Sequence, residues 1–412
     1  MSSPGEIGTA RYALEVGHPC PQAGRGPYAG SMSTPPAVRL LESAIDAGTI
    51  PGGIIAHGHD PRPVARGGAL PGGPALPADA ILRIQSMAKA ITAVAALRLV
   101  ERGELGLDSP VAPWLPELAA PRMLPHPGAA LEEAIPAPAP ITLRHLLTCT
   151  SGVGIVTVES PLHQAMAATG LEAGPAPWQL AADDWLTALG ELPLVGEPGR
   201  IWRYHHSFGV LGILISRLAG AALQEHLRTD LLTPLGMVDT GAWVPEEQQH
   251  RMPPAFAARL RERGEAERGE VELVQTQPAG GGPLAGPPAH DVSHGELVST
   301  AADYLRFLQA LRDGELLSPE HLELLTTDQV PDEAKRPDSF YPGFWAGTGW
   351  GFGVSIATEG VHRGRWGWSG GCGTGFFVDP DGTIGLLLTQ VEIGEHLMPL
   401  LEAFQELPAP AR

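Results

Sequence analysis

Strand and helix patterns are unevenly distributed along this chain, and that distribution is what most limits its possible folds. A short strand is predicted over residues 52–58 near one end. Near the other end, residues 375–378 and 384–388 flank the turn sequence DPDG, a strong hairpin signal. Between them, residues 90–250 carry mostly helical patterns. Strands at both ends of a helical middle predict an α+β fold, with one sheet assembled from the two terminal parts.

The length of 412 residues favours one large domain or two interleaved ones. We expect a flexible leader over residues 1–34, a single domain over 35–405 and a tail over 406–412. Within the domain, an α/β part comprises about 35–85 and 290–405, and a helical part comprises about 86–289. Thr142 and Thr300 are the predicted N-caps of two of the helices. Residues 258–290 change from a charged run to a Gly/Pro-rich loop and are predicted to form a surface connector.

Charge and cysteine content exclude several classes of protein. The formal charge of −19 repels phosphate backbones, which argues against nucleic acid as a partner. No apolar run approaches the ~18–20 residues of a membrane span, and residues 1–34 contain no apolar stretch typical of a secretory signal. The three dispersed cysteines, Cys20, Cys149 and Cys372, are simplest to explain in a reduced cytoplasmic protein. The sequence does not indicate an oligomeric state.

A serine and a lysine three residues apart begin the helix predicted after residue 85. Only two of the 27 basic Lys and Arg residues are lysines, Lys89 and Lys335. An amine at Lys89 can lose its proton and act as a base, which a guanidinium cannot. Ser86 lies on the same helix face as Lys89 and would be the nucleophile. The alternative is an N-cap serine followed by a solvent-exposed lysine.

Four separated segments, taken in order, resemble the penicillin-recognising serine hydrolases: class C β-lactamases, DD-peptidases and family VIII esterases. The segments are Ser86-Met87-Ala88-Lys89, residues 141–152 (ITLRHLLTCTSG), residues 198–204 (PGRIWRY) and residues 367–374 (GWSGGCGT). Residues 234–240 (PLGMVDT) and 298–304 (VSTAADY) also resemble landmarks of that superfamily. The likeness covers about residues 35–405 and implies a β-lactamase-like fold.

The resemblance assigns roles to further residues. Tyr204 would be the tyrosine of the second motif and share a proton with Lys89 and Ser86, and a phenol beside an ammonium is expected to have a lowered pKa. Trp368, Ser369 and Gly370 match the third motif, Lys-Thr-Gly, and would line the substrate site. The backbone amides of Ser86 and Gly371 would form the oxyanion hole.

Two departures from the motifs point away from antibiotics. Trp368 stands where β-lactamases have the lysine that would pair with a β-lactam carboxylate. His206 replaces the asparagine of the second motif, a planar amide suited to orienting a substrate amide. Both changes favour neutral acyl substrates, with His206 among the substrate-binding residues.

Other candidate sites are weaker. Residues 367–371 spell Gly-x-Ser-x-Gly, which would make Ser369 a rival nucleophile, but that motif requires a helix after the serine and a hairpin is predicted instead. The histidine pairs at 57/59 and 205/206 lack a third ligand at a recognisable spacing, so we expect no metal and no cofactor.

The sequence thus predicts a serine hydrolase that forms an acyl-enzyme on Ser86. The expected activity is that of a carboxylesterase on small neutral acyl esters, so the partner is a small-molecule acyl substrate. The alternatives are a β-lactamase or D-amino-acid peptidase, an acyltransferase that uses an alcohol in place of water, and a catalytically inactive binding protein on the same fold.

Overall fold

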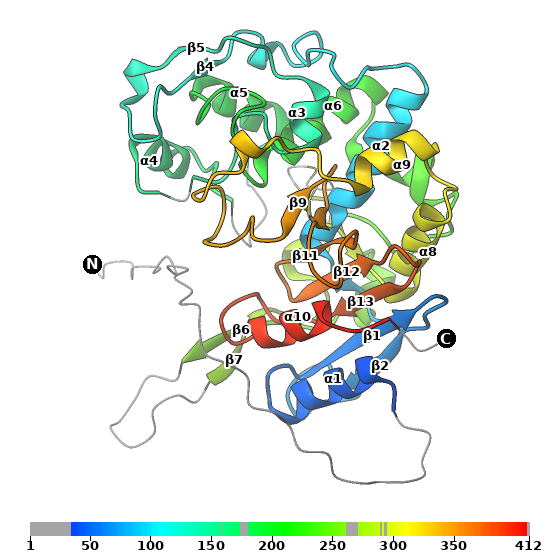
Figure 1. Cartoon of the computed structure of the whole chain (residues 1–412). Coiled ribbons are helices and arrows are strands. Elements are labelled where there is room, and N and C mark those ends of the chain that lie inside the picture. Colours follow the sequence, from blue (N-terminus) through cyan, green and yellow to red (C-terminus); the bar gives the residue numbers. More distant parts are fainter. Residues whose placement is uncertain are drawn as a thin grey trace, which may run out of the picture.

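The computed structural model describes residues 34–156, 158–173, 180–260, 271–288, 291 and 295–409. Its centre is a seven-stranded antiparallel sheet of order β2-β1-β13-β12-β11-β10-β9 (Figure 1). The strands are β1 (Gly52–Gly58), β2 (Val64–Gly67), β9 (Thr348–Trp350), β10 (Ser355–Ala357), β11 (Trp366–Gly370), β12 (Thr374–Val378) and β13 (Ile384–Leu388). Because β1 pairs with β13, the two ends of the chain build one sheet, which confirms the predicted α+β architecture.

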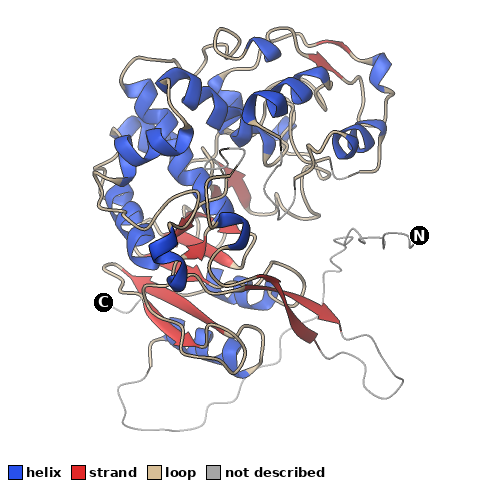
Figure 2. Cartoon of the chain, turned by 180° about the vertical axis from the view of Figure 1, so that it is seen from behind, coloured by secondary structure: helices blue, strands red, loops and turns tan. Residues whose placement is uncertain are grey.

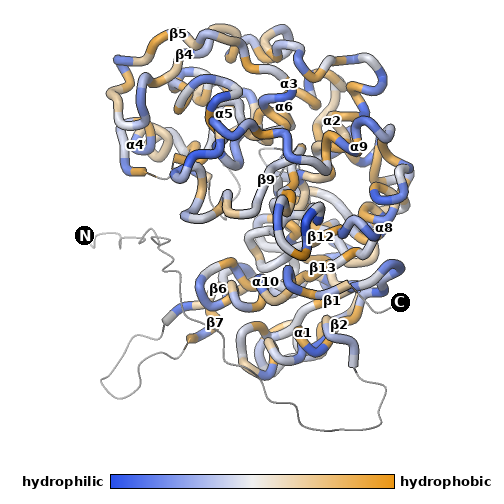
Figure 3. The backbone as a smooth tube through the Cα atoms, in the orientation of Figure 1, coloured by the Kyte–Doolittle hydropathy of each residue, from blue (hydrophilic) through white to orange (hydrophobic). Residues whose placement is uncertain are grey.

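Helices α1 (Pro36–Asp46) and α10 (Met398–Gln405) cover one face of this sheet. Hydrophobic and hydrophilic residues alternate around α1 (Figure 3), and its apolar side, which includes Leu41, is buried. Successive strand residues point to opposite faces. Ile55, Phe377 and Leu387 therefore pack under α1 and α10, whereas Ile54, Phe376 and Leu386 belong to the core on the other face.

The second face is covered by α2 (Ala88–Glu101) and α8 (Ala301–Arg312), and the remaining helices gather beyond them in a separate region (Figure 2). That region contains α3 (Leu143–Leu147), α4 (Pro161–Ala168), α5 (Ala182–Glu191), α6 (His206–Ala219), α7 (Leu223–Leu227) and α9 (Pro319–Thr326). Short turns complete the set: η1 (Gln85–Met87), η2 (Pro116–Leu118), η3 (Leu131–Glu133), η4 (Arg228–Leu232), η5 (Glu246–Arg251), η6 (Gly282–Leu284) and η7 (Asp332–Ala334).

Both predicted N-caps are confirmed. The Thr142 hydroxyl accepts a hydrogen bond from the His145 amide at 3.3 Å, and the Thr300 hydroxyl accepts one from the Asp303 amide at 3.2 Å. Among the described residues, no single helix is long and apolar enough to cross a membrane. By length and composition alone, the bent pair His206–Ala219 and Leu223–Leu232 passes the same test, with a 71° bend between its two helices.

Three two-stranded pairs lie outside the main sheet: β3 (Leu82–Arg83) with β8 (Val298–Ser299), β4 (Arg122–Met123) with β5 (Ile135–Pro136), and β6 (Ala255–Leu260) with β7 (Val271–Gln277). The last pair corrects the prediction of a plain connector over residues 258–290, of which 261–270, 289–290 and 292–294 lie outside the described residues. Phe256 of β6 is buried against the core beneath α10, which attaches this strand pair to the rest of the domain.

The predicted leader, residues 1–34, lies outside the described residues except for Thr34, as do residues 410–412 of the predicted tail. The domain from α1 to α10 is continuous in space. Its helical part interrupts the sheet between β2 and β9, and the segment that leads into α2 passes directly beneath β11.

Candidate active site

Ser86 lies in η1, a single 3₁₀ turn that continues directly into α2. The turn differs from the α-helical start that the sequence predicts, because Gln85 has φ +42°, a left-handed conformation that a regular helix does not contain. Three hydrogen bonds hold the turn in place: Ile84 N to Leu297 O at 2.9 Å, Thr374 Oγ1 to Ile84 O at 3.4 Å, and Tyr304 Oη to Met87 O at 3.0 Å. The turn that carries Ser86 is therefore bound to α8, to β12 and to the segment before β8.

Lys89 is fully buried and donates a hydrogen bond to Ser86 Oγ at 3.1 Å. Its Nζ lies 5.0 Å from the centroid of the Tyr204 ring and 5.9 Å from that of Phe208. Burial disfavours the ammonium and lowers the pKa of Lys89 to about 8, although attraction by the Glu296 carboxylate opposes this in part. An amine with that pKa is partly neutral near pH 8 and can accept the Ser86 proton.

Tyr204 precedes α6 and is almost completely buried. Its hydroxyl hydrogen-bonds with the Ser86 side chain and accepts a hydrogen bond from Trp368 Nε1 at 2.6 Å. Burial raises the pKa of Tyr204 well above its usual value, more than these two bonds lower it. The predicted lowering of the Tyr204 pKa is therefore wrong, and the phenol is a neutral proton donor.

Backbone strain is concentrated at this site. Among the described residues, the non-glycine residues with positive φ are Gln85, Cys149 and His205. Gln85 precedes Ser86, His205 follows Tyr204, and the Cys149 carbonyl accepts a hydrogen bond from the Arg203 amide at 2.9 Å. His205, with φ +87° and ψ −71°, has the strained geometry of a classic γ-turn. Such conformations persist where surrounding structure enforces them, typically at functional sites.

The glycine turn after β11 lies against the turn that carries Ser86. A Cβ on Gly370 would lie 2.3 Å from the Ile84 carbonyl oxygen, and one on Gly371 would lie 2.5 Å from Gln85 Oε1. The contact at Gly370 is with backbone and only glycine permits it, whereas the contact at Gly371 is with the end of the Gln85 side chain. Gly371 is exposed, and its carbonyl is fixed by the Ile393 amide at 2.8 Å, so the turn borders the surface beside Ser86.

Two predicted substrate-binding residues, His206 and Ser369, are engaged by other parts of the protein. His206 is fully buried, its Nε2 lies 2.7 Å from the Leu171 carbonyl, and burial lowers its pKa to about 4, so it is a neutral interior residue. Ser369 lies on β11 opposite Gly375, and a Cβ on that glycine would meet both Ser369 Oγ and Phe404 of α10. Ser369 therefore faces α10, on the side of the sheet away from Trp368, and a strand rather than a helix follows it.

Sequence reasoning missed two neighbours of the site. A Cβ on Gly295 would lie only 3.1 Å from Lys89 Nζ, so the backbone at Gly295 passes close to the buried amine. The Phe340 ring lies 4.9 Å from the Tyr204 ring, centroid to centroid. Neither residue belongs to a motif, and each reaches the site only through folding of a distant segment.

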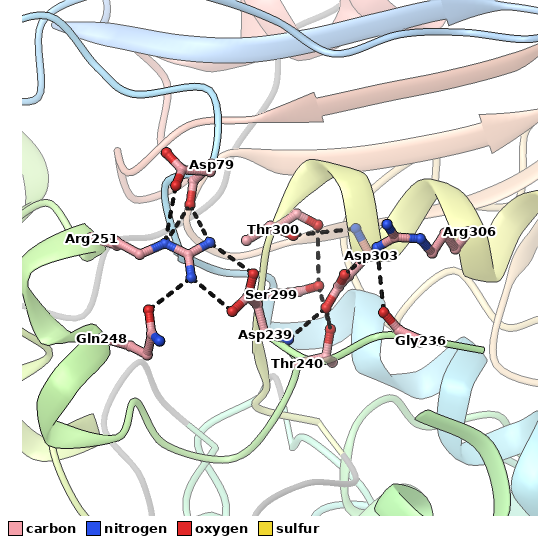
Figure 4. Close-up of polar contacts among 10 residues, drawn as sticks. All are labelled: Asp79, Gly236, Asp239, Thr240, Gln248, Arg251, Ser299, Thr300, Asp303 and Arg306. Carbon is pink, nitrogen blue, oxygen red and sulfur yellow. Dashed lines mark hydrogen bonds and ion pairs between the residues drawn. The ribbon is translucent and has the colours of Figure 1, made fainter. Parts of the chain in front are cut away.

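A polar network fixes the strand that leads to Ser86 (Figure 4). Asp303 accepts hydrogen bonds from the Asp239 amide at 2.8 Å and from Thr240 Oγ1 at 3.1 Å, and Thr240 also bonds Ser299 of β8 at 2.8 Å. Arg251 forms two 2.7 Å contacts with the Asp239 carboxylate. Because β8 pairs with β3, the two predicted landmark segments support the approach to Ser86 from one side.

In the part of the chain that the structure describes, no group of three or more His, Cys, Asp or Glu side chains could hold a metal ion. The arrangement at Ser86 instead provides a hydroxyl, a buried amine and a neutral phenol in mutual contact. These groups suit acyl transfer through a covalent serine intermediate.

Comparison with known proteins agrees with this geometry, which is that of a serine hydrolase with a β-lactamase-like fold. The family model described as Beta-lactamase matches residues 37–391, and the chain belongs to that family. Esterase EstB from Burkholderia gladioli is 31% identical over 343 residues, which cover 80% of this chain and 82% of that protein. Lovastatin esterase from Penicillium rubens is 28% identical and covers 82% of this chain and 88% of that protein.

A solved structure shares the fold. The structure titled "EstCE1, a hydrolase with promiscuous acyltransferase activity" superposes with a TM-score of 0.70 at 24% identity, covering 89% of this chain and 97% of that one. The comparison confirms the β-lactamase-like architecture predicted from the ordered motifs. The matches to Esterase EstB and lovastatin esterase agree with the expectation of a serine hydrolase related to esterases.

Proposed function

We propose that this protein is a carboxylesterase that hydrolyses small neutral acyl esters through an acyl-enzyme on Ser86. The observation that carries the proposal is the fully buried Lys89 amine, 3.1 Å from Ser86 Oγ, with its pKa lowered to about 8. The esterases among the relatives support the same class of reaction.

In the proposed mechanism, neutral Lys89 accepts the Ser86 proton while Ser86 Oγ bonds to the ester carbonyl carbon. The resulting oxyanion is held by the backbone amides of Ser86 and Gly371. Collapse breaks the carbon–oxygen bond to the alcohol, and the departing oxygen receives a proton from Tyr204, which Lys89 then reprotonates. A water molecule attacks the acyl-enzyme by the reverse sequence of proton transfers, releases the acid and restores Ser86.

The polar groups around Ser86 favour esters over β-lactams. Trp368 occupies the third-motif position, and its indole N–H is directed to Tyr204. A β-lactam carboxylate would therefore find no cation at this position. The asparagine position is occupied by the buried His206, which leaves no side-chain amide there to orient a substrate amide.

The nucleophile is tested by Ser86→Ala, with p-nitrophenyl acetate as substrate. We expect a fall in kcat of at least about a thousandfold, as for loss of other serine nucleophiles, with unchanged circular dichroism. Ser369→Ala is the matched control and should retain activity, because its hydroxyl faces α10. Full activity of Ser86→Ala, or loss of activity only in Ser369→Ala, would refute the assignment. A fluorophosphonate adduct located at Ser86 by mass spectrometry would distinguish an active hydrolase from an inactive binding protein.

A second candidate function is acyl transfer to an alcohol. Monacolin J acid methylbutanoyltransferase from Aspergillus terreus is 34% identical over 170 residues, which cover 40% of this chain and 39% of that protein. Product analysis with an added alcohol would show a new ester in place of free acid. Nitrocefin hydrolysis, measured in parallel, tests the β-lactamase alternative.

We further infer a reducing, cytoplasmic location. Cys149 and Cys372 are both free and buried, and burial raises the pKa of each thiol to about 12, so neither is a reactive thiolate. Cell fractionation of a tagged chain would test this inference.

A further inference from the structure

Aromatic side chains gather around Tyr204. Aromatic residues make up only 6% of the chain. An aromatic cluster nevertheless forms here, with neighbouring ring centroids between 4.6 and 6.2 Å apart, from Trp202, Tyr204, Phe340, Phe344, Trp345, Trp350 and Trp368. Its members come from three separate segments of the chain. The cluster therefore encloses one of the proposed catalytic groups with apolar surface.

The segment that contributes Phe340 is firmly anchored. Buried Arg203, next to Tyr204, donates to Asp338 Oδ2 at 2.8 Å and to the Asp338 carbonyl at 3.0 Å. Lys335, the second lysine of the chain, contacts Asp328 at 2.6 Å and Asp332 at 2.9 Å. The Lys335 contacts brace residues 328–335 internally, and the Arg203–Asp338 contacts attach this segment to the one that holds Tyr204. Phe340 is thus a positioned part of the site.

Two members of the cluster next to Tyr204 are partly exposed. Phe340 and Trp368 are only half-buried, whereas Trp202 and Trp350 are fully buried. The rings of Phe340 and Trp368 lie 4.9 Å and 5.3 Å from the Tyr204 ring. Partly open aromatic rings next to a reacting group form an apolar surface on which a bound molecule can rest.

The position of this surface indicates which half of an ester it contacts. In the proposed function, on which this inference rests, Tyr204 gives its proton to the departing alcohol oxygen. The carbon skeleton attached to that oxygen must therefore lie next to Tyr204, and the acyl chain must extend from the carbonyl carbon on the other side of the bond. We propose that Phe340 and Trp368 bind the alcohol half of the substrate and select an uncharged alcohol with an apolar ring.

The same surface would receive the acceptor alcohol if the enzyme transfers acyl groups, because transfer to an alcohol reverses the step in which an alcohol leaves. Ester hydrolysis with a ring-bearing alcohol and acyl transfer to such an alcohol therefore share one specificity surface. Phe340 is the better residue to test, since Trp368 also donates a hydrogen bond to Tyr204.

The experiment compares Phe340→Ala with the wild type on three esters: benzyl acetate, ethyl acetate and ethyl phenylacetate. The variant-to-wild-type ratio of kcat/KM removes the intrinsic reactivity of each ester. We expect this ratio to fall about tenfold further for benzyl acetate than for ethyl acetate, by loss of apolar contact. Ethyl phenylacetate, with its ring on the acyl side, should behave like ethyl acetate. Phe340→Leu should recover part of the loss.

Tyr341→Ala is the matched control. Its ring lies 5.1 Å from Phe340 in the same segment, is 40% exposed, and has no ring contact with Tyr204 among the described residues. This variant should leave all three ratios equal. An equal fall for all esters in Phe340→Ala, or a selective fall for ethyl phenylacetate, would overturn the inference. Absence of hydrolysis of every ester by the wild type would instead refute the proposed function.

Discussion

At the residue scale, a buried amine makes activity depend on pH. Burial lowers the pKa of Lys89 to about 8, and only the neutral amine can accept the Ser86 proton. We therefore expect kcat/KM to rise with pH, to reach half its maximum near pH 8, and to level off above it. A pH profile with p-nitrophenyl acetate would measure this dependence. Lys89→Arg should be inactive across the whole range, because a guanidinium does not deprotonate. A profile that levels off below pH 6 would exclude Lys89 as the base.

The hydrogen bond from the Trp368 indole orients the hydroxyl of Tyr204. The indole N–H can only donate, so the Tyr204 oxygen accepts this bond and directs its own proton toward Ser86 or the leaving oxygen. Trp368→Phe removes the bond and should lower kcat about tenfold, the equivalent of one hydrogen bond to a reacting group. Steady-state kinetics with ethyl acetate would measure the change.

Trp350→Phe provides the matched control for that variant. Trp350 packs 4.6 Å from Trp368, centroid to centroid, and its buried Nε1 has no hydrogen-bond partner among the described residues. The control removes the same volume and an indole N–H that makes no bond, so it should change stability more than kcat. Equal losses of kcat in both variants would show that packing, and not the bond to Tyr204, is responsible.

At the element scale, one buried ion pair attaches the end of the chain to the sheet. Arg365 and Asp379 are 5% and 9% exposed, and their nearest atoms are 2.7 Å apart. Arg365 also bonds the Gln405 and Leu407 carbonyls at the end of α10 and stacks 3.7 Å from the Phe377 ring centroid. Asp379→Ala leaves this guanidinium buried without its carboxylate, which typically costs about 3–5 kcal/mol of unfolding free energy.

Urea unfolding would measure that cost. The double variant Arg365→Met with Asp379→Leu should recover most of it, since apolar replacement of a buried pair is often neutral. Esterase activity of the folded fraction should persist in both variants, because the pair lies beneath α10 on the face of the sheet away from Ser86. A single variant as stable as the wild type would contradict this account of how α10 is attached.

At the scale of the whole molecule, local sequence signals predicted elements better than they predicted the site. Short apolar runs and the hairpin turn were sufficient to predict β1, β12 and β13, because each signal depends on neighbouring residues. The β6–β7 pair was missed, since its sequence is charged and the packing of Phe256 on a distant core is not a local signal. The order of the motifs indicated Ser86, Lys89 and Tyr204. Burial depends on the complete fold, so the sequence did not predict the raised pKa of Tyr204 or the enclosure of the His206 side chain.

Burial of Lys89 also imposes a cost on the stability of the whole fold. The pKa of Lys89 falls from 10.5 to about 8 on folding, so the unfolded chain binds more protons between these two pH values. The loss of unfolding free energy caused by burying the Lys89 ammonium is full below pH 8 and decreases as pH rises. It vanishes above the pKa that Lys89 has in the unfolded chain. A shift of that size corresponds to about 3 kcal/mol.

Replacement of Lys89 by an apolar side chain of similar length should therefore stabilise the protein while abolishing its activity. We expect Lys89→Met to raise the unfolding free energy at pH 7 by up to about 3 kcal/mol, less the lost bond to Ser86. The difference in unfolding free energy between Lys89→Met and the wild type should shrink as pH increases from 8 to 10. In that range Lys89 of the folded wild type becomes neutral, so its burial costs less. Urea unfolding of both proteins at pH 7 and pH 9.5 would measure the difference. A Lys89→Met variant that is less stable than the wild type at pH 7 would show that the ammonium is well accommodated in the folded protein, and that Lys89 is not held ready as a base.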